Sequence, residues 1–197
     1  MDKREEMKKI KDEIVALTSS PLYQYRKANN YFPVIGEGSH DAKIMFIGEA
    51  PGKNEAETGR PFCGRSGKFL DELLSSINLP RESVYITNIV KDRPHENRDP
   101  LPEEIALYGP FLERQIEIIK PKVLATLGRF SMQYIMTLFK ASETQPTISK
   151  VHGKVFEITT NYGRINIIPL YHPAVAIYNQ GSKAELFEDF KILKKYV

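Results

Sequence analysis

The sequence GEAPGKNEAETGRPFCGRSG, which occupies residues 48–67, is the stretch around which the predicted fold is organised. The apolar run AKIMFI at 42–47 precedes it and predicts a buried strand, and KFLDELL at 68–74 follows it with the apolar spacing of a helix. The stretch is therefore a long loop at the carboxyl end of a strand, where open α/β sheets place their ligands. Its glycines and prolines favour a shaped, functional backbone over disorder.

The start of this loop resembles a phosphate-binding loop only superficially. Three residues separate Gly48 from Gly52, and Asn54 follows Lys53 where serine or threonine is needed. The dinucleotide fingerprint GxGxxG is also missing. These two nucleotide-binding motifs are excluded, and the loop by itself is more typical of a structural connection.

Length and composition predict one globular domain, residues 1–197. A chain of 197 residues can bury a sizeable core, and its 41% hydrophobic and 27% charged residues are ordinary for a globular protein. The formal net charge of +3 permits nucleic-acid binding without arguing for it, because acidic and basic residues are interspersed.

The cysteine content and the absence of long apolar runs limit the cellular locations and the cofactors that we expect for this chain. The one cysteine, Cys63, excludes an intrachain disulfide and a cluster held by four cysteines of this chain. No apolar run is long enough to span a bilayer, so we expect no membrane partner. The charged segment at 1–14 is not a secretory signal, and we therefore expect an intracellular, cytoplasmic location.

Periodicity along the rest of the chain predicts alternating strands and helices. Further strands are expected at 84–87 and 123–127, and a hairpin is expected from the apolar runs 155–159 and 164–168, which flank Asn161-Tyr162-Gly163. Helices are expected at 2–17, 64–77, 102–119, 129–138 and 183–195, with polar loops at 91–100 and 140–150. This alternation predicts an α/β fold, with a parallel sheet covered by helices on both faces.

Three polar side chains stand at predicted strand ends: Glu49, Asn88 and His172. The carboxyl ends of parallel strands share one edge of the sheet, so these side chains and the ring of Phe62 can form a site for a planar heterocycle. Asn88 can read a base edge through its amide, and Phe62 can stack on the base. His172 can donate to a leaving group, and Glu49 can orient a water or stabilise a cation. Taken singly, each is more typical of a turn, a cap or the core, and the residues alone leave both interpretations open.

Several ordered motifs together resemble one known family, the uracil-DNA glycosylase superfamily, and most of all its thermostable family 4. The similarity runs from about residue 20 to the end of the chain. Its motifs are GEAPG at 48–52, GRPFCGRSG at 59–67, YITNIVKDRP at 85–94, NRDPLPEE at 97–104, IKPKVLATLGRF at 119–130 and YHPA at 171–174.

The resemblance implies a fold and an activity. The fold is a three-layer α/β/α sandwich around a four-stranded, mostly parallel sheet, and the reaction is hydrolysis of the N-glycosidic bond of deoxyuridine in DNA. By the family pattern, Glu49 handles the attacking water and Phe62 stacks on the base. Asn88 reads the uracil edge, and His172 hydrogen-bonds the uracil carbonyl as the base departs. The expected substrate-binding residues are Gly48, Ala50, Phe62, Asn88 and His172.

The expected partner is uracil-containing DNA, single- or double-stranded, bound by a monomer. The target nucleotide must be flipped out of a duplex before it can react. Ile177 and Tyr178 can fill the gap that it leaves. The remaining predicted contacts to the DNA backbone are Gly52, Arg65, Ser66, Lys91 and Arg93.

The chain departs from family 4 at one place. Family 4 members carry four cysteines that hold an iron–sulfur cluster, and the matching positions here are Leu17, Ser20, Asp92 and Tyr108. None of these side chains supplies a thiolate, so we predict no cluster and a region held by packing and hydrogen bonds.

This departure leaves other activities open. The first is a glycosylase for another deaminated base, such as hypoxanthine or xanthine. The second is a catalytically inactive DNA-binding homologue, although pure binding would not need the trio of Glu49, Asn88 and His172. The third is an enzyme acting on free nucleosides.

Overall fold

The computed structural model describes residues 2–144 and 146–197, without the side chain of Gln180. Its strands form one sheet in the order β1-β3-β2-β4-β6-β5. Within it, β2 pairs in parallel with β3 and β4, and β4 pairs in parallel with β6. The strands are β1 (Glu37–Gly38), β2 (Ile44–Gly48), β3 (Tyr85–Asn88), β4 (Val123–Leu127), β5 (Phe156–Thr160) and β6 (Gly163–Leu170).

The α/β prediction is confirmed, but the expected number of strands was wrong. The sheet has six strands rather than four. The parallel strands β3, β2, β4 and β6 match the four-stranded expectation, and antiparallel edge strands extend them on both sides. β5 comes from the predicted hairpin, whereas the two-residue β1 carries too little sequence signal to be predicted.

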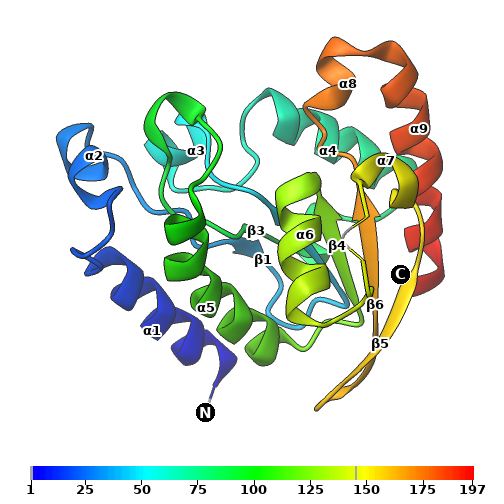
Figure 1. The fold of residues 1–197 in the computed structure, drawn as a ribbon, viewed down its shortest axis with the longest axis horizontal. Helices are drawn as coiled ribbons and strands as arrows, with labels where there is room; N and C mark the ends of the chain where they lie inside the picture. The colour runs from blue at the N-terminus through cyan, green and yellow to red at the C-terminus, as the bar shows by residue number, and fades with distance from the viewer. Residues whose placement is uncertain (1, 145) are drawn as a thin grey trace.

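Helices cover both faces of the sheet, giving three layers (Figure 1). Core residues of α1, α5 and α6 pack with one face, and those of α4 and α9 pack with the other. The α-helices are α1 (Lys3–Val15), α2 (Tyr23–Ala28), α3 (Lys53–Thr58), α4 (Arg65–Ser76), α5 (Pro102–Ile119), α6 (Arg129–Leu138), α7 (Ile148–Val151), α8 (Val175–Tyr178) and α9 (Gln180–Lys191). Short 3₁₀ helices occur at Arg81–Ser83, His95–Asn97 and Ile192–Tyr196.

Strand β2 explains why the sheet lies at the centre. Met45 and Ile47 belong to the core under α1, α5 and α6, whereas Ile44 and Phe46 belong to the core under α4 and α9. All four side chains are buried, as expected for a parallel strand covered on both faces. The strand's carboxyl end is thereby fixed in position, and the long loop starts from it.

Some predicted loops contain short helices. The stretch 48–67 includes α3, and the loop expected at 140–150 ends in α7. Residues 1 and 145, which the predicted 1–197 domain and the predicted 140–150 loop include, lie outside the described residues. None of the helices in the described part of the chain has both the length and the apolar character that crossing a bilayer requires.

Candidate active site

A pocket of about 620 Å³ opens at the carboxyl ends of the central strands. Glu49 follows β2, Asn88 ends β3, and His172 follows β6. All three line this pocket together with Phe62 from the long loop. The four side chains that the sequence singled out therefore meet in one cavity.

Asn88 and Phe62 are held close to the backbone of Gly48. A Cβ added at Gly48 would lie 2.3 Å from Asn88 Oδ1 and 2.8 Å from the Phe62 ring. Only glycine leaves room for both side chains here. The Asn88 side chain is 2% exposed, so its amide is almost completely shielded from bulk water.

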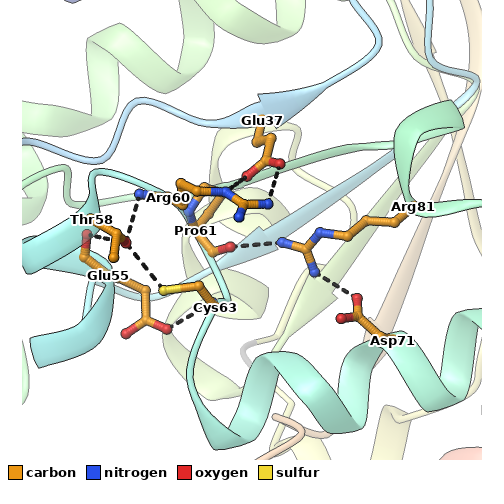
Figure 2. A network of polar contacts seen from close by, with 8 residues as sticks. All are labelled: Glu37, Glu55, Thr58, Arg60, Pro61, Cys63, Asp71 and Arg81. Carbon is orange, nitrogen blue, oxygen red and sulfur yellow. Dashed lines mark hydrogen bonds and ion pairs between the residues drawn. The ribbon is translucent and has the colours of Figure 1, made fainter.

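The turn that carries Phe62 is held from inside the pocket by Glu55 of α3. Glu55 Oε1 accepts hydrogen bonds from the backbone N–H groups of Cys63 (3.0 Å) and Gly64 (2.9 Å), and Figure 2 shows this carboxylate beside Cys63. Phe62 has a φ of 46°, a left-handed conformation that is costly for a bulky residue. The backbone of Gly67 packs so closely that a Cβ there would lie 1.8 Å from Phe62 O. The surrounding contacts therefore hold the backbone of Phe62 in this unfavourable conformation, and they fix the position of its ring.

Two arginines hold the outer side of the same loop (Figure 2). Arg81 donates to the Pro61 carbonyl (2.7 Å) and to Asp71 (2.8 Å), which joins the loop to α4. Arg60 donates twice to the carboxylate of Glu37, at 2.8 and 3.0 Å. Phe62 therefore lies between anchored neighbours.

His172 is positioned as a neutral hydrogen-bond donor. Its Nδ1 accepts the backbone N–H of Ala174 at 3.1 Å, so the neutral ring carries its hydrogen on Nε2. Burial lowers the pKa of His172 to about 4, and the charge of Glu55 opposes this only in part. The ring centroids of His172 and Phe62 are 5.6 Å apart.

Glu49 ionises near neutral pH. Burial raises its pKa to about 7, and the negative charge of Asp99 adds to the rise, while Arg129 opposes it. Asp99 and Arg129 form an ion pair of 2.6 Å. A carboxyl group with this pKa can accept a proton at physiological pH.

Most of the remaining predicted residues also line the pocket, and the sequence missed several others. Those predicted are Ala50, Gly52, Arg65, Ser66, Ile177 and Tyr178; those missed are Lys53, Asn54, Glu55, Gly64, Asn97 and Ala174. Among the large hydrophobic side chains that the structure describes, Tyr178 is the most exposed, at 86%. Asn97 belongs to one of the family motifs, at 97–104, and that membership is the signal that would have pointed to it.

The structure contradicts the predicted DNA contact of Lys91, and it places Arg93, another predicted contact, outside the pocket lining. Lys91 is fully buried, and its amine donates to internal oxygens, so it cannot meet a DNA phosphate. The chain continues inward after β3 through the buried Ile89 and Val90, but the polar sequence that begins at Lys91 gives no sign that Lys91 is buried as well. Arg93 is partly exposed but lies outside the pocket lining, and it donates to Asn97 (2.8 Å) and Tyr31 (2.6 Å).

Comparison with known proteins agrees with this geometry. A model of the uracil DNA glycosylase superfamily matches residues 35–191. The chain belongs to the uracil-DNA glycosylase superfamily. A Type-4 uracil-DNA glycosylase of Sulfurisphaera tokodaii is 45% identical over 96% of this chain and 84% of its own length. Proteins of the same description from Archaeoglobus fulgidus and Thermotoga maritima are 44% and 40% identical, covering 95% and 98% of this chain and 91% and 96% of their own lengths.

The four residues that the resemblance matched to the cluster cysteines, Leu17, Ser20, Asp92 and Tyr108, do not fit an iron–sulfur cluster. Ser20 Oγ lies 2.7 Å from Tyr108 OH, and Tyr108 OH donates to Asp92 Oδ2 at 2.6 Å. Arg26 donates to both oxygens of Asp92, at 3.1 and 3.2 Å. Leu17 packs against the same core. The oxygens of Ser20, Asp92 and Tyr108 are hydrogen-bonded to one another and Leu17 is packed against the core, so none of these side chains offers the thiolate that a cluster requires.

Proposed function

We propose that this chain is a uracil-DNA glycosylase that excises uracil from DNA by hydrolysing the N-glycosidic bond. The observation that carries the proposal is the convergence of Glu49, Phe62, Asn88 and His172 in one pocket. Relatives named Type-4 uracil-DNA glycosylases, at 40–45% identity over nearly the whole chain, support it.

Base recognition rests on Asn88 and Phe62. Uracil presents an acceptor and a donor side by side, O4 and N3–H, and one carboxamide can pair with both. Because Asn88 is shielded from water, a base that offers the wrong pattern leaves polar atoms unpaired. Phe62 stacks on the flipped base and fixes its plane.

Bond cleavage uses Glu49 and His172. The bond between C1′ and N1 breaks with its electron pair going to uracil, which leaves an oxocarbenium-like sugar. His172 Nε2–H donates to the uracil oxygen on which negative charge develops. The carboxylate of Glu49 stabilises the sugar cation and orients a water whose oxygen bonds to C1′. The proton that this water loses passes to Glu49.

DNA is held around the mouth of the pocket. Arg65 and Ser66 start helix α4, where free backbone N–H groups and the helix dipole favour a phosphate. Gly52 and, further out, Arg93 extend this backbone contact. Ile177 and Tyr178 on α8 enter the space vacated by the flipped nucleotide.

The single 1–197 domain, the monomeric state and the intracellular location stay predictions. Sedimentation analysis with and without DNA tests the monomeric state.

The decisive experiment is single-turnover excision from oligonucleotides that contain uracil, hypoxanthine or xanthine, followed by alkaline cleavage of abasic sites. We expect uracil release, and about a 100- to 1,000-fold slower rate for Glu49→Gln and for His172→Ala. Glu57→Gln, an exposed carboxylate on α3, serves as the control. Release of hypoxanthine or xanthine instead of uracil would show that the substrate is another deaminated base. Binding without any release would indicate an inactive homologue.

The reading role of Asn88 has its own test. Asn88→Asp offers an acceptor to the exocyclic amine of cytosine, so this variant should release cytosine as well as uracil. Asn88→Ala should release uracil far more slowly, at a rate still measurable in single-turnover conditions, and should not release cytosine. Unchanged uracil release by Asn88→Ala would remove Asn88 from the site.

A further inference from the structure

Lys91 lies directly behind the residue that reads the base. Its Nζ donates to the backbone carbonyl of Asn88 at 2.7 Å. It also donates to Thr87 Oγ1 (2.7 Å) and Gln115 Oε1 (2.6 Å). A fourth, longer hydrogen bond runs to the backbone carbonyl of Ile35 (3.5 Å). The side chain is fully buried, and all four acceptors are neutral oxygens.

The acceptors are themselves fixed by a second set of hydrogen bonds. Thr87 Oγ1 donates to the carbonyl of Ile35 (2.7 Å), and Gln115 Nε2 donates to the same carbonyl (2.9 Å) and to Tyr85 OH (3.2 Å). Burial lowers the pKa of the Lys91 amine, and both of its protonation states keep hydrogens to donate. The network joins β3, α5 and the segment before β1 around a single nitrogen.

The contact determines the orientation of one peptide group. The Asn88 carbonyl belongs to the peptide that links Asn88 to Ile89, and the N–H of that peptide donates to Gly48 O at 3.0 Å. One end of the peptide is thus held by Lys91 and the other by β2. Holding this plane, together with the pairing of Asn88 with Gly48 in the sheet, restricts ψ of Asn88 and so the direction of the Cα–Cβ bond from which the carboxamide extends.

We propose that Lys91 is a positioning residue that holds the Asn88 peptide so that the carboxamide meets the base edge in a reactive geometry. The inference rests on the proposed role of Asn88 in reading uracil. A displacement of about 1 Å at a reacting centre can cost about 100-fold in rate. Burying a lysine here costs free energy, because its amine must be desolvated, and a positioning role accounts for that cost.

The test is a double-mutant cycle between Lys91→Met and Asn88→Ala, measured as single-turnover uracil release. Methionine keeps the length of the lysine side chain and removes its donors. We expect Lys91→Met alone to lower the rate about 10- to 100-fold, with affinity for abasic-site DNA changed by less than about twofold. In the Asn88→Ala background the same change should cost little more, because residues that act through one another are not additive. Lys122→Met, an exposed lysine at the amino end of β4, is the matched control.

Each result decides between specific alternatives. A wild-type rate for Lys91→Met, or full additivity with Asn88→Ala, would overturn the positioning role and leave the function of Asn88 intact. A wild-type rate for Asn88→Ala would instead overturn the reading role on which the inference depends. Where Lys91→Met does not fold, Gln115→Leu takes its place in the cycle, because it removes one of the acceptors that fix the amine. The same non-additive loss is expected for it, and additivity would again overturn the inference.

Discussion

The side-chain oxygen of Asn88 lies over the Cα of Gly48, only 2.3 Å from the point that a Cβ there would occupy. Both residues end neighbouring parallel strands and are paired in register. The glycine at the end of β2 is therefore a requirement of the pocket, because any side chain at this position would push against Asn88 or against the Phe62 ring.

We predict that Gly48→Ala lowers uracil release without abolishing folding. The added methyl group must displace Asn88 Oδ1 or Phe62, and displacement of a group that orients the base by about 1 Å costs about 100-fold in rate. Single-turnover kinetics and urea unfolding of the same preparation separate the two effects. Gly163→Ala is the control, since its Cβ would meet nothing within 4 Å, although its φ of 123° adds some strain. A rate for Gly48→Ala within the range of this control would contradict the proposed packing.

The raised pKa of Glu49 predicts the pH dependence of the reaction. Glu49 must be ionised to accept a proton and its pKa is about 7, so kcat/KM should rise as pH increases through 7 and then level off. His172, with a pKa of about 4, stays neutral over this range. Asp99→Asn removes a charge that raises the Glu49 pKa, so the rise in kcat/KM should move to lower pH, more at low salt than at high salt. Arg129→Gln should move it to higher pH, and the remote Asp41→Asn should leave it in place.

The same pKa predicts a trade-off between activity and stability. A carboxyl group whose pKa is raised on folding, here from 4.5 to about 7, favours the folded state when protonated. Its contribution is complete below 4.5 and is lost as pH rises through 7. Glu49→Gln should therefore be inactive yet more stable than the native chain at pH 8, by about 1–2 kcal/mol after allowance for solvent screening. Melting temperatures at pH 5 and pH 8 test this, and an advantage that is equal at both pH values would rule out the ionisation as its cause.

How far the sequence determines this fold can be seen along β2 and β3. Strong apolar runs predicted both strands, and the polar residue at each strand end predicted one edge of the sheet. Asn88 and Glu49 were identified for this reason. Phe62 was identified because the loop that carries it starts at the same edge of the sheet, although a phenylalanine after a proline is by itself more typical of the core.

Lys91 shows why the remainder could not be predicted. A lysine in a polar, proline-bounded segment is normally exposed, and only the tertiary path after β3 takes its side chain inward to Gln115. Glu55 is similar, since its hydrogen bonds to Cys63 and Gly64 form only where the turn after α3 brings these backbone N–H groups back to the helix. Non-local contacts decide both cases, and they leave no trace in local periodicity.

The buried network of Ser20, Arg26, Asp92 and Tyr108 yields the last prediction, which concerns stability. Arg26 also donates to the carbonyls of Ile14 (3.1 Å) and Val15 (2.7 Å) at the end of α1. The network therefore fastens α1 and α2 to α5 and to the chain after β3. Asp92→Asn would leave the Arg26 charge buried without a counter-charge, and we expect a loss of about 3–5 kcal/mol in the free energy of unfolding.

Tyr108→Phe should cost less, about 1–3 kcal/mol, because it leaves hydroxyl and carboxylate groups short of one partner without stranding a charge. Glu157→Gln, which breaks an exposed ion pair with Arg164, should cost at most about 1 kcal/mol and is the control. Urea unfolding of the three variants at one pH measures the order. If Asp92→Asn and Glu157→Gln proved equally mild, the buried network would not be what joins the amino-terminal helices to the sheet.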